Sequence, residues 1–436
     1  MRAEEAGDAA GLRPTRGGRL TEYALPGMRV REHTVPVPLR WGADDGETIS
    51  VFVRELVHPA RDTEDLPLLL FLQGGPGGKG PRPVGRGDWI DRALRDFRVV
   101  LLDQRGTGRS SPVTARRMSA FADPAAAADH LMAFRADSIV ADAEHVRSTV
   151  YGGRSWTTLG QSYGGFLTLT YLSQAPQGLD RCLVTGGLPS VLPDARELYR
   201  RTGPRVAAKT RRFYERFPGD VARVGAVADV LATEEVLLPD GDRLTVRRLQ
   251  TLGHALGTGT GAEQLHWLFD EALVDGAPSD GFLDEVARRT SYWGNPLYAV
   301  LHESIYGSGP GATGWAAEAE RGPEFAPDRR PLPFTGEMTY PWMFDEIASL
   351  RPFRAAAHAL AELPAYPPLY DPVRLGANEV PVDAVVYFDD MYVDAGLSLE
   401  TADAVGNVRT WVTNEFEHDG LRTGDVLDRL LGLRDR

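Results

Sequence analysis

The sequence predicts a doubly wound α/β fold, in which a mostly parallel sheet is covered by helices and a helical lid is inserted between two strands. Two observations lead to this prediction. Short continuous apolar runs, such as LPLLLFLQGG and FRVVLLDQRG, end near glycines, as buried parallel strands do. Strand-like segments give way to amphipathic helical ones from about residue 190 to 365, and then return. A chain of two independent domains would not return to alternating strands and helices after this helical segment.

We expect four parts along the chain. They are a flexible N-terminal tail at residues 1–19, the first part of the core at 20–190, the inserted helical lid at 191–368 and the second part of the core at 369–436. No internal repeat is visible, and no linker is long enough to separate independent domains.

The elements of the first core part follow one another in a regular order. Residues 23–57 alternate between apolar and polar side chains, which predicts two antiparallel strands joined by the turn DDGE. After the two apolar runs, ADSIVADAEHVRSTV has helical spacing. WTTLGQSYGGFLTLTYLSQAP then predicts a strand, a tight turn and a helix, and RCLVTGGLP predicts a further strand.

The lid and the second core part differ in character. Segments such as ARELYRRTGPRVAAKTRRFYERF, TVRRLQTLGHALG and AEQLHWLFDEALVD are amphipathic and predict helices. Strand-like sequence returns at VPVDAVVYFDD and NVRTWVTN, and the last stretch, LRTGDVLDRLLGLRDR, predicts one helix.

Composition and charge restrict the possible partners. Of 436 residues, 48 are Lys or Arg and 61 are Asp or Glu, which gives a net charge of −13. Nucleic acids and anionic membranes require a positive face, so neither is an expected partner. An acidic protein suits substrates that carry an amine. The single cysteine, Cys182, excludes an intrachain disulfide and a cysteine-based zinc site, and we expect it to be a small core residue.

We expect no targeting signal in this sequence. The first residues are charged and rich in glycine and alanine, without the apolar segment of a secretory signal. No apolar run reaches the roughly 18 residues that a membrane-spanning helix needs. We therefore expect a cytoplasmic protein without membrane partners.

A candidate nucleophile lies in the motif Gly-Gln-Ser-Tyr-Gly, centred on Ser162. The motif alone is a weak signal in a glycine-rich chain. Here it directly follows a predicted strand and precedes a predicted helix, where a serine is held in strained geometry with its oxygen exposed above the sheet. The alternative is an ordinary turn between a strand and a helix.

A serine nucleophile needs a base and an acid, which follow it in this order of the chain. Of nine histidines, only His418 follows a predicted strand near the C-terminus, whereas His358 stands in helical sequence. Asp389, Asp390 and Asp394 follow the preceding predicted strand. Adjacent aspartates point to opposite sides of an extended chain, so one of them reaches the imidazole; we favour Asp390 and keep Asp389 as the alternative.

Two backbone N–H groups are candidates for an oxyanion hole. The run Gln-Gly-Gly-Pro-Gly-Gly follows the first buried strand, and the N–H of Gly75 can join that of Tyr163. A phosphate-binding loop is the alternative, but the run lacks the Gly-Lys-Ser/Thr ending of a P-loop. Nearby, we expect Asp103 and Arg105 to form a structural ion pair that fixes the loop after its strand.

Four motifs together resemble the proline iminopeptidases, which are prolyl aminopeptidases of the α/β-hydrolase fold. They are QGGPGG, DQRGTGRS, GQSYGG and EHDGLR, and the similarity covers roughly residues 45–190 and 375–436. The family usually has a histidine where Gln73 stands. Its acid motif, Gly-Arg-Tyr-Asp, matches Tyr387 to Asp390, which favours Asp390 as the acid.

The resemblance implies that lid glutamates bind the free α-amine of the substrate. The best matches are Glu303 and Glu337, with Asp345 and Glu346 as alternatives. A carboxylate pair in an apolar pocket becomes favourable when a cation offsets its desolvation. The matched glutamates stand among aromatic residues: Tyr292, Trp293, Tyr306, Trp342 and Phe344. Alternatively, the glutamates are on helix surfaces and the aromatic residues form the lid core.

The expected function is that of a serine aminopeptidase that removes N-terminal proline, or another small residue, from short peptides with a free N-terminus. Ser162 attacks the carbonyl, His418 transfers the proton and Asp390 orients His418, without a metal or cofactor. Another hydrolase of this fold, such as an esterase, an amidase or an aminopeptidase of different preference, is the main alternative. A non-catalytic binding protein is a further one. Epoxide hydrolases and dehalogenases carry aspartate at the position of Ser162.

Overall fold

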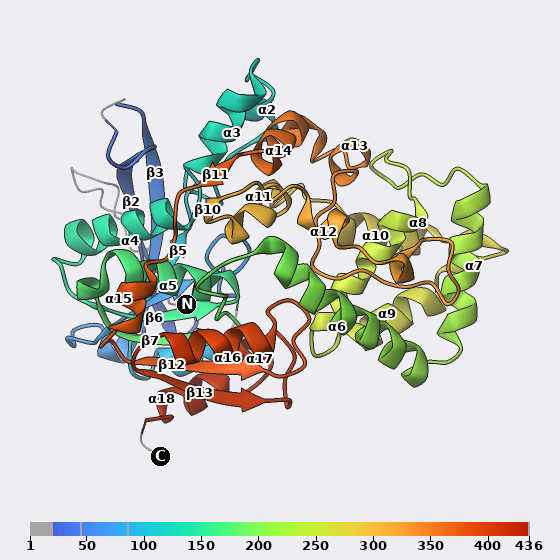
Figure 1. Ribbon diagram of the computed structural model, residues 1–436. Coiled ribbons are helices and arrows are strands. Elements are labelled where there is room, and N and C mark those ends of the chain that lie inside the picture. The colour runs from blue at the N-terminus through green and yellow to red at the C-terminus, as the bar shows by residue number, and fades with distance from the viewer. Residues whose placement is uncertain (1–20, 44–45, 85–86, 435–436) are drawn as a thin grey trace, which may run out of the picture.

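The computed structural model describes residues 21–43, 46–84 and 87–434, so the predicted tail at 1–19 lies outside the described residues. Within this part of the chain, a nine-stranded sheet has the order β1-β2-β3-β5-β4-β6-β7-β12-β13 (Figure 1). Its strands are β1 (Thr21–Leu25), β2 (Met28–Pro38), β3 (Thr48–Val57), β4 (Leu68–Leu72), β5 (Arg98–Asp103), β6 (Trp156–Gln161), β7 (Leu179–Thr185), β12 (Val382–Tyr387) and β13 (Val408–Thr413).

The sheet is antiparallel at one end and parallel elsewhere. Strands β1, β2, β3 and β5 pair antiparallel in turn, whereas all pairs from β5 to β13 are parallel. In register, Leu70 lies opposite Val100 on one side and Thr158 on the other. Because parallel strands end at the same edge, the loops after β4, β6, β12 and β13 meet there.

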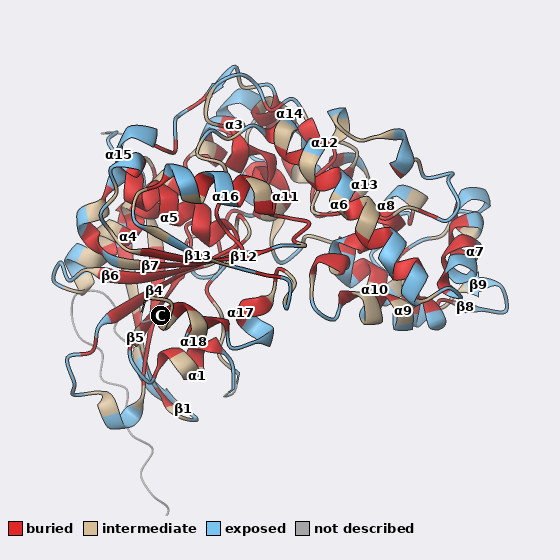
Figure 2. Ribbon diagram, turned by 60° about the horizontal axis from the view of Figure 1, so that its bottom comes forward, coloured by how far each residue is buried: buried red, intermediate tan, exposed pale blue. Residues whose placement is uncertain are grey.

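Helices cover both faces of the central strands, as the mostly parallel sheet requires. Every residue of β4, β6 and β12 is buried (Figure 2). Leu70 of β4 packs with α4 and α5, whereas its neighbour Phe71 packs on the opposite face with α1 and α18. The core helices are α1 (Trp89–Ala93), α2 (Ala115–Met118), α3 (Pro124–Met132), α4 (Ala136–Val150), α5 (Tyr163–Gln174), α15 (Pro372–Gly376), α16 (Ala395–Ala404), α17 (Gly420–Thr423) and α18 (Val426–Leu431).

Two predictions of secondary structure need correction. Residues 23–57 contribute parts of three strands rather than two, because β1 folds back on β2 through a turn at Gly27, which has a positive φ of 75°. The single helix predicted at the C-terminus is two, α17 and α18. Gly424 separates them in extended conformation, and a Cβ there would lie 2.2 Å from the Phe416 ring, so the chain must pass this ring closely.

Asp103 and Arg105 do not form the ion pair that we predicted. Asp103, the last residue of β5, binds Arg82 at 2.6 Å, and Arg105 binds Asp142 at 2.6 Å. Arg105 lies in the turn beyond the strand, so its side chain leaves in a different direction from that of Asp103. Both residues are buried, and each pair fixes the loop after β5 separately.

Residues 191–368, called the lid below, are mainly helical and lie between β7 and β12. Its helices are α6 (Ala195–Arg216), α7 (Asp220–Thr233), α8 (Val246–Gln250), α9 (Gly261–Asp270), α10 (Asp280–Thr290), α11 (Pro296–Leu301), α12 (Ala316–Ala319), α13 (Met343–Glu346) and α14 (Arg354–Ala361). Two pairs of two-residue strands are also present: β8 (Leu273–Val274) with β9 (Ala277–Pro278), and β10 (Gly309–Pro310) with β11 (Ala365–Tyr366). Helices α7 to α10 form a lobe beside the core (Figure 1).

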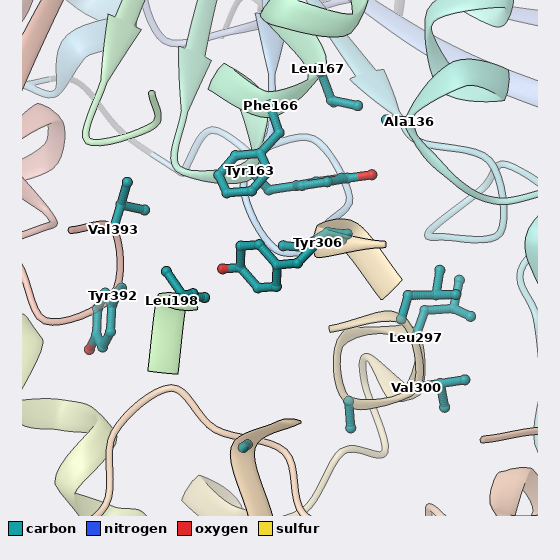
Figure 3. Close-up of a cluster of buried hydrophobic side chains, with 14 of the residues drawn as sticks. Ala136, Tyr163, Phe166, Leu167, Leu198, Leu297, Val300, Tyr306, Tyr392 and Val393 are labelled. Carbon is teal, nitrogen blue, oxygen red and sulfur yellow. The ribbon is translucent and has the colours of Figure 1, made fainter. Parts of the chain in front are cut away.

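The lid packs on the core through apolar side chains. Figure 3 shows Tyr306 of the lid beside Tyr163 and Phe166 of α5, and the rings of Phe166 and Tyr306 are 5.6 Å apart. The edge-to-face geometry of this pair favours a fixed arrangement of lid and core. Within the described residues, no helix is both long enough and apolar enough to cross a bilayer.

Candidate active site

Ser162 stands on a strained turn between β6 and α5. Its φ of 56° and ψ of −123° lie outside the regions that side-chain-bearing residues ordinarily occupy. The turn is tight: a Cβ at Gly164 would lie 1.9 Å from the carbonyl oxygen of Leu72, so no residue but glycine fits without a shift. This geometry presents the serine hydroxyl at the carboxyl edge of the sheet.

Asp390 and His418 lie in contact at the same edge. The Nδ1 atom of His418 is 2.6 Å from Oδ2 of Asp390, and the backbone N–H groups of Tyr392 and Val393 donate to Oδ1 of Asp390 at 2.8 and 3.1 Å. These three contacts fix the orientation of the Asp390 carboxyl group. Its neighbour Asp389 is partly exposed and faces Arg212 at 3.4 Å on the surface. The structure therefore brings Asp390, and not Asp389, to His418.

The turn after β7 lies between Ser162 and His418. A Cβ at Gly186 would be 3.2 Å from His418 Nδ1, and one at Gly187 would be 2.3 Å from the Ser162 carbonyl oxygen. Ser162 and His418 therefore both lie next to the pair Gly186 and Gly187. Within the described part of the chain, no hydrogen bond joins the Ser162 hydroxyl to the His418 ring. Such bonds often form only when substrate closes the site.

The environment of His418 adjusts its basicity. Burial alone would lower the pKa of the ring, but the charge and hydrogen bond of Asp390 outweigh burial, and the Glu337 carboxylate adds to their effect. The pKa of His418 is therefore raised above its usual value of 6.5. A raised pKa makes the ring a better proton acceptor.

Gly75 and Tyr163 provide two backbone donors near Ser162. The loop that holds Gly75 approaches closely, since a Cβ at Gly74 would lie 3.0 Å from Ser162 Cβ. Gly75 has a positive φ of 136°, which favours glycine. Among the described residues, neither of the two N–H groups donates to another protein group. The loop is braced by Gln104, whose amide donates to the Gln73 carbonyl at 2.8 Å.

Glu337 lies in a lid stretch without regular structure and faces histidines. It accepts a hydrogen bond from the Tyr298 hydroxyl at 2.6 Å, and His254 Nε2 is 3.9 Å from the same carboxyl oxygen. Burial would raise the pKa of Glu337, but the surrounding His254, His302 and His418 outweigh it and lower the pKa to about 2. Glu337 is therefore a carboxylate at neutral pH.

Glu303 begins the 3-10 helix η4 (Glu303–Tyr306) and is buried rather than on a helix surface. Its Oε2 accepts a long hydrogen bond of 3.4 Å from the N–H of Ala317 in α12, and Oε1 is buried without a partner in the described residues. Burial raises the pKa of Glu303, opposed by N–H groups at the start of α12 and by Thr313. One oxygen of this carboxyl group thus remains available.

Sequence reasoning missed a further buried residue of the lid. Tyr199 of α6 is buried, and its hydroxyl has no partner within the described residues. Burial raises the pKa of Tyr199, and the charges of Glu303 and Glu337 add to this effect. The alternatives Asp345 and Glu346 instead form surface ion pairs with Arg354 and Arg247.

A row of rings connects Glu337 to His418. His254 stacks on Tyr392 with ring centroids 4.9 Å apart, and Tyr392 meets His418 edge to face at 4.8 Å. Neither His254 nor Tyr392 could be identified from sequence, because His254 lies among helical residues and Tyr392 has no motif of its own. In the described residues, no group of three or more His, Cys, Asp or Glu side chains is placed to hold a metal ion.

Comparison with known proteins agrees with this geometry. A family model described as the alpha/beta hydrolase fold matches residues 67–237, which include Gly75, Ser162 and Tyr163. A protein of Aeromonas sobria named proline iminopeptidase is 46% identical over 417 residues, which cover 94% of this chain and 98% of that protein. A proline iminopeptidase of Aspergillus aculeatus is 32% identical over 93% of this chain and 94% of its own length. The chain therefore has the α/β-hydrolase fold and belongs to the proline iminopeptidase family.

Proposed function

We propose that this chain is a serine aminopeptidase that releases proline, or another small N-terminal residue, from short peptides. The observation that carries the proposal is the 2.6 Å contact between Asp390 and His418 at the sheet edge where Ser162 occupies its strained turn. The names of the Aeromonas and Aspergillus relatives support the same activity.

In the proposed reaction, Ser162 Oγ attacks the scissile carbonyl carbon while His418 accepts the hydroxyl proton. The N–H groups of Gly75 and Tyr163 bind the resulting oxyanion, and each such donor contributes about 3 kcal/mol. His418 then protonates the leaving amine, which departs and leaves an acyl-enzyme. Water attacks the acyl group by the same route, and the free amino acid and Ser162 are regenerated. Asp390 holds the tautomer of His418 and stabilises the imidazolium.

The two lid carboxylates give the proposed selectivity for a free N-terminus. Glu337 is ionised, and Glu303 has a buried oxygen without a partner among the described residues. An ammonium group between them would satisfy this oxygen and offset the desolvation of both carboxylates. A blocked N-terminus brings neither charge nor donors of this kind. The expected substrates are therefore short peptides with a free N-terminus.

A panel of four substrates tests this function: proline amide, alanine amide, N-acetylproline amide and a short-chain ester. We expect the fastest turnover with proline amide and resistance of the acetylated substrate. Ser162→Ala is the control and should abolish turnover of all four. Equal rates with proline amide and its acetylated form would contradict the proposed selectivity, and turnover of the ester alone would indicate an esterase.

The acidic balance of the chain, with 61 Asp and Glu against 48 Lys and Arg, supports peptides rather than nucleic acids or anionic membranes as partners.

The cytoplasmic location remains a prediction from the sequence. Cell fractionation followed by detection of the protein would test the location.

A further inference from the structure

The loop that carries His418 is held by the lid. Three consecutive residues, Glu417, His418 and Asp419, each bond to a lid residue. Lys209 of α6 donates to Oε1 of Glu417, the His418 N–H donates to the Gly257 carbonyl at 3.1 Å, and the Gly259 N–H donates to Oδ1 of Asp419 at 2.9 Å. The catalytic histidine thus receives its ring partner, Asp390, from the core, but much of its backbone support from the lid.

Of these three contacts, the one between Lys209 and Glu417 is an ion pair. Lys209 is buried and Glu417 is half-buried, and Oε2 of Glu417 has no hydrogen-bond partner in the described residues. Burial raises the pKa of Glu417, and the nearby charges of Asp389 and Asp390 add to this, whereas Lys209 opposes it. Loss of Lys209 would therefore leave a poorly solvated carboxyl group next to His418.

Helix α6 supports both loops of the acid and base pair. One turn before Lys209, Arg205 binds Oδ2 of Asp394 at 2.7 Å and the carbonyl of Phe388 at 2.8 Å, on either side of Asp390 along the chain. The same face of one lid helix thus contacts the loop of Asp390 and the loop of His418. A shift of α6 would move both loops relative to Ser162, which is held by β6 and α5.

We propose that Lys209 is a positioning residue which, through Glu417, holds His418 in reach of Ser162, so that the lid contributes to the chemical step as well as covering the site. The proposal rests on the role of His418 as the base in the proposed function. It does not involve the amine of the substrate, since Lys209 acts on the histidine loop.

The test compares three variants with the wild type. Lys209→Met removes the charge and keeps most of the side-chain length, and the double variant Lys209→Met/Glu417→Gln also removes the carboxylate that would be left unpaired. Arg200→Met is the matched control, because Arg200 lies on the same helix and binds Glu197 at 2.9 Å and Glu320 at 3.2 Å, both within the lid. Each variant is measured for kcat and KM on proline amide and for the rate of labelling by a fluorophosphonate.

We expect Lys209→Met to lower kcat by about 10- to 100-fold with KM within about twofold, since a small misplacement of a catalytic group has effects of this size. The labelling rate should fall by a similar factor, because labelling requires His418 but no amine recognition. The double variant should regain part of the loss, and Arg200→Met should behave like the wild type.

Three results would overturn the proposal: an unchanged labelling rate in both Lys209 variants, a change in KM alone, or an equal loss in Arg200→Met. If Lys209→Met does not fold, the double variant decides, since it contains no unpaired buried carboxylate. The labelling assay also separates this proposal from the proposed function. An enzyme that is labelled normally but does not cleave proline amide would refute the aminopeptidase function and leave the role of Lys209 to be judged by its labelling rate.

Discussion

The core and the lid both supply charged groups to the site, but they hold them in different ways. In the core, the loops of Gly75, Ser162, Asp390 and His418 follow strands β4, β6, β12 and β13, whose parallel pairing fixes where each loop begins. In the lid, Glu303 begins a short 3-10 helix, and Glu337 lies between helices in an irregular stretch. In the proposed function, the sheet edge carries the reacting groups, whereas tertiary packing of the lid places the carboxylates that bind the substrate amine and supports the loop of His418.

Asp390 of the core and Glu303 of the lid also differ in how well their carboxyl oxygens are satisfied. Asp390 accepts three hydrogen bonds, including one from the ring of His418. Glu303 retains a buried oxygen without a partner, and so does the hydroxyl of Tyr199, among the described residues. Buried polar groups normally have partners, so the unsatisfied groups of the lid favour a ligand there. The Asp390–His418 pair is thus already formed, whereas the proposed function requires a substrate amine to complete the lid groups.

The largest expected effect on kcat distinguishes Asp390 from its neighbour Asp389. Asp390→Asn should lower kcat by about 10⁴-fold, because the amide can hold the wrong tautomer of the histidine. Asp389→Asn should change kcat by less than about threefold, as for a surface residue whose ion pair contributes little. Steady-state hydrolysis of proline amide measures both. A severe loss in Asp389→Asn with a mild one in Asp390→Asn would reverse the assignment.

A smaller effect is expected from the lid and depends on the substrate. Glu337→Gln should lower kcat/KM for proline amide by about 100-fold, which corresponds to the loss of a buried charge pair of about 3 kcal/mol. The same variant should change hydrolysis of an N-blocked short ester by less than about threefold, a limit set by the ordinary scatter of neutral substitutions.

Glu303→Gln is the companion variant for this prediction. It should follow the same pattern, with an additional loss of thermal stability, because the Glu303 carboxylate also accepts from the start of α12. If either variant lost activity equally on the amide and the N-blocked ester, that glutamate would have no role in binding the amine.

The pH dependence of ester hydrolysis reports on His418 without the amine-binding step. His418 must be neutral to accept the serine proton, and its pKa is raised, so activity should fall as pH drops through a midpoint above 6.5. The residual activity of Asp390→Asn should have its midpoint at lower pH, because burial then acts on His418 with less opposition. A profile of kcat/KM for an N-blocked ester avoids titration of a substrate amine. A midpoint that rises in Asp390→Asn would contradict this account of His418.

The smallest effect concerns a core residue outside the site. Cys182 in β7 is fully buried, and burial raises the pKa of its thiol to about 12. Iodoacetamide at neutral pH should therefore leave the native enzyme unmodified and fully active, since the thiolate is the reactive form. The unfolded protein serves as the positive control and should be alkylated. Rapid alkylation of the native enzyme with loss of activity would show that the core opens near β7.

Much of the core could be predicted from the sequence, because its signals are local. The predicted fold class is confirmed, and the helix predicted at 136–150 is α4 with the same ends. Continuous apolar runs identify strands that are buried on both faces, and glycines identify the turns that follow them. Since motifs at strand ends meet at one edge, the loops of Ser162, Asp390 and His418 could be expected together before any coordinates were known.

The lid could be predicted only in outline, because its contacts join residues that are far apart in the chain. The amphipathic pattern predicts α6, but it does not reveal that Lys209 contacts Glu417, which is 208 positions away. Similarly, Tyr298 and His254 meet Glu337 only after folding. The prediction that Asp103 and Arg105 pair with each other was wrong for the same reason. The sequence shows that buried charged residues need partners of opposite charge, but it does not show which partners lie within reach.

The most direct test of the division between core and lid is to identify the residue that a fluorophosphonate labels, by mass spectrometry of the modified enzyme. The account predicts one adduct, on Ser162, formed at the same rate in Glu337→Gln and much more slowly in His418→Ala. An adduct on another residue with loss of activity, or labelling of Ser162 that does not depend on His418, would contradict it.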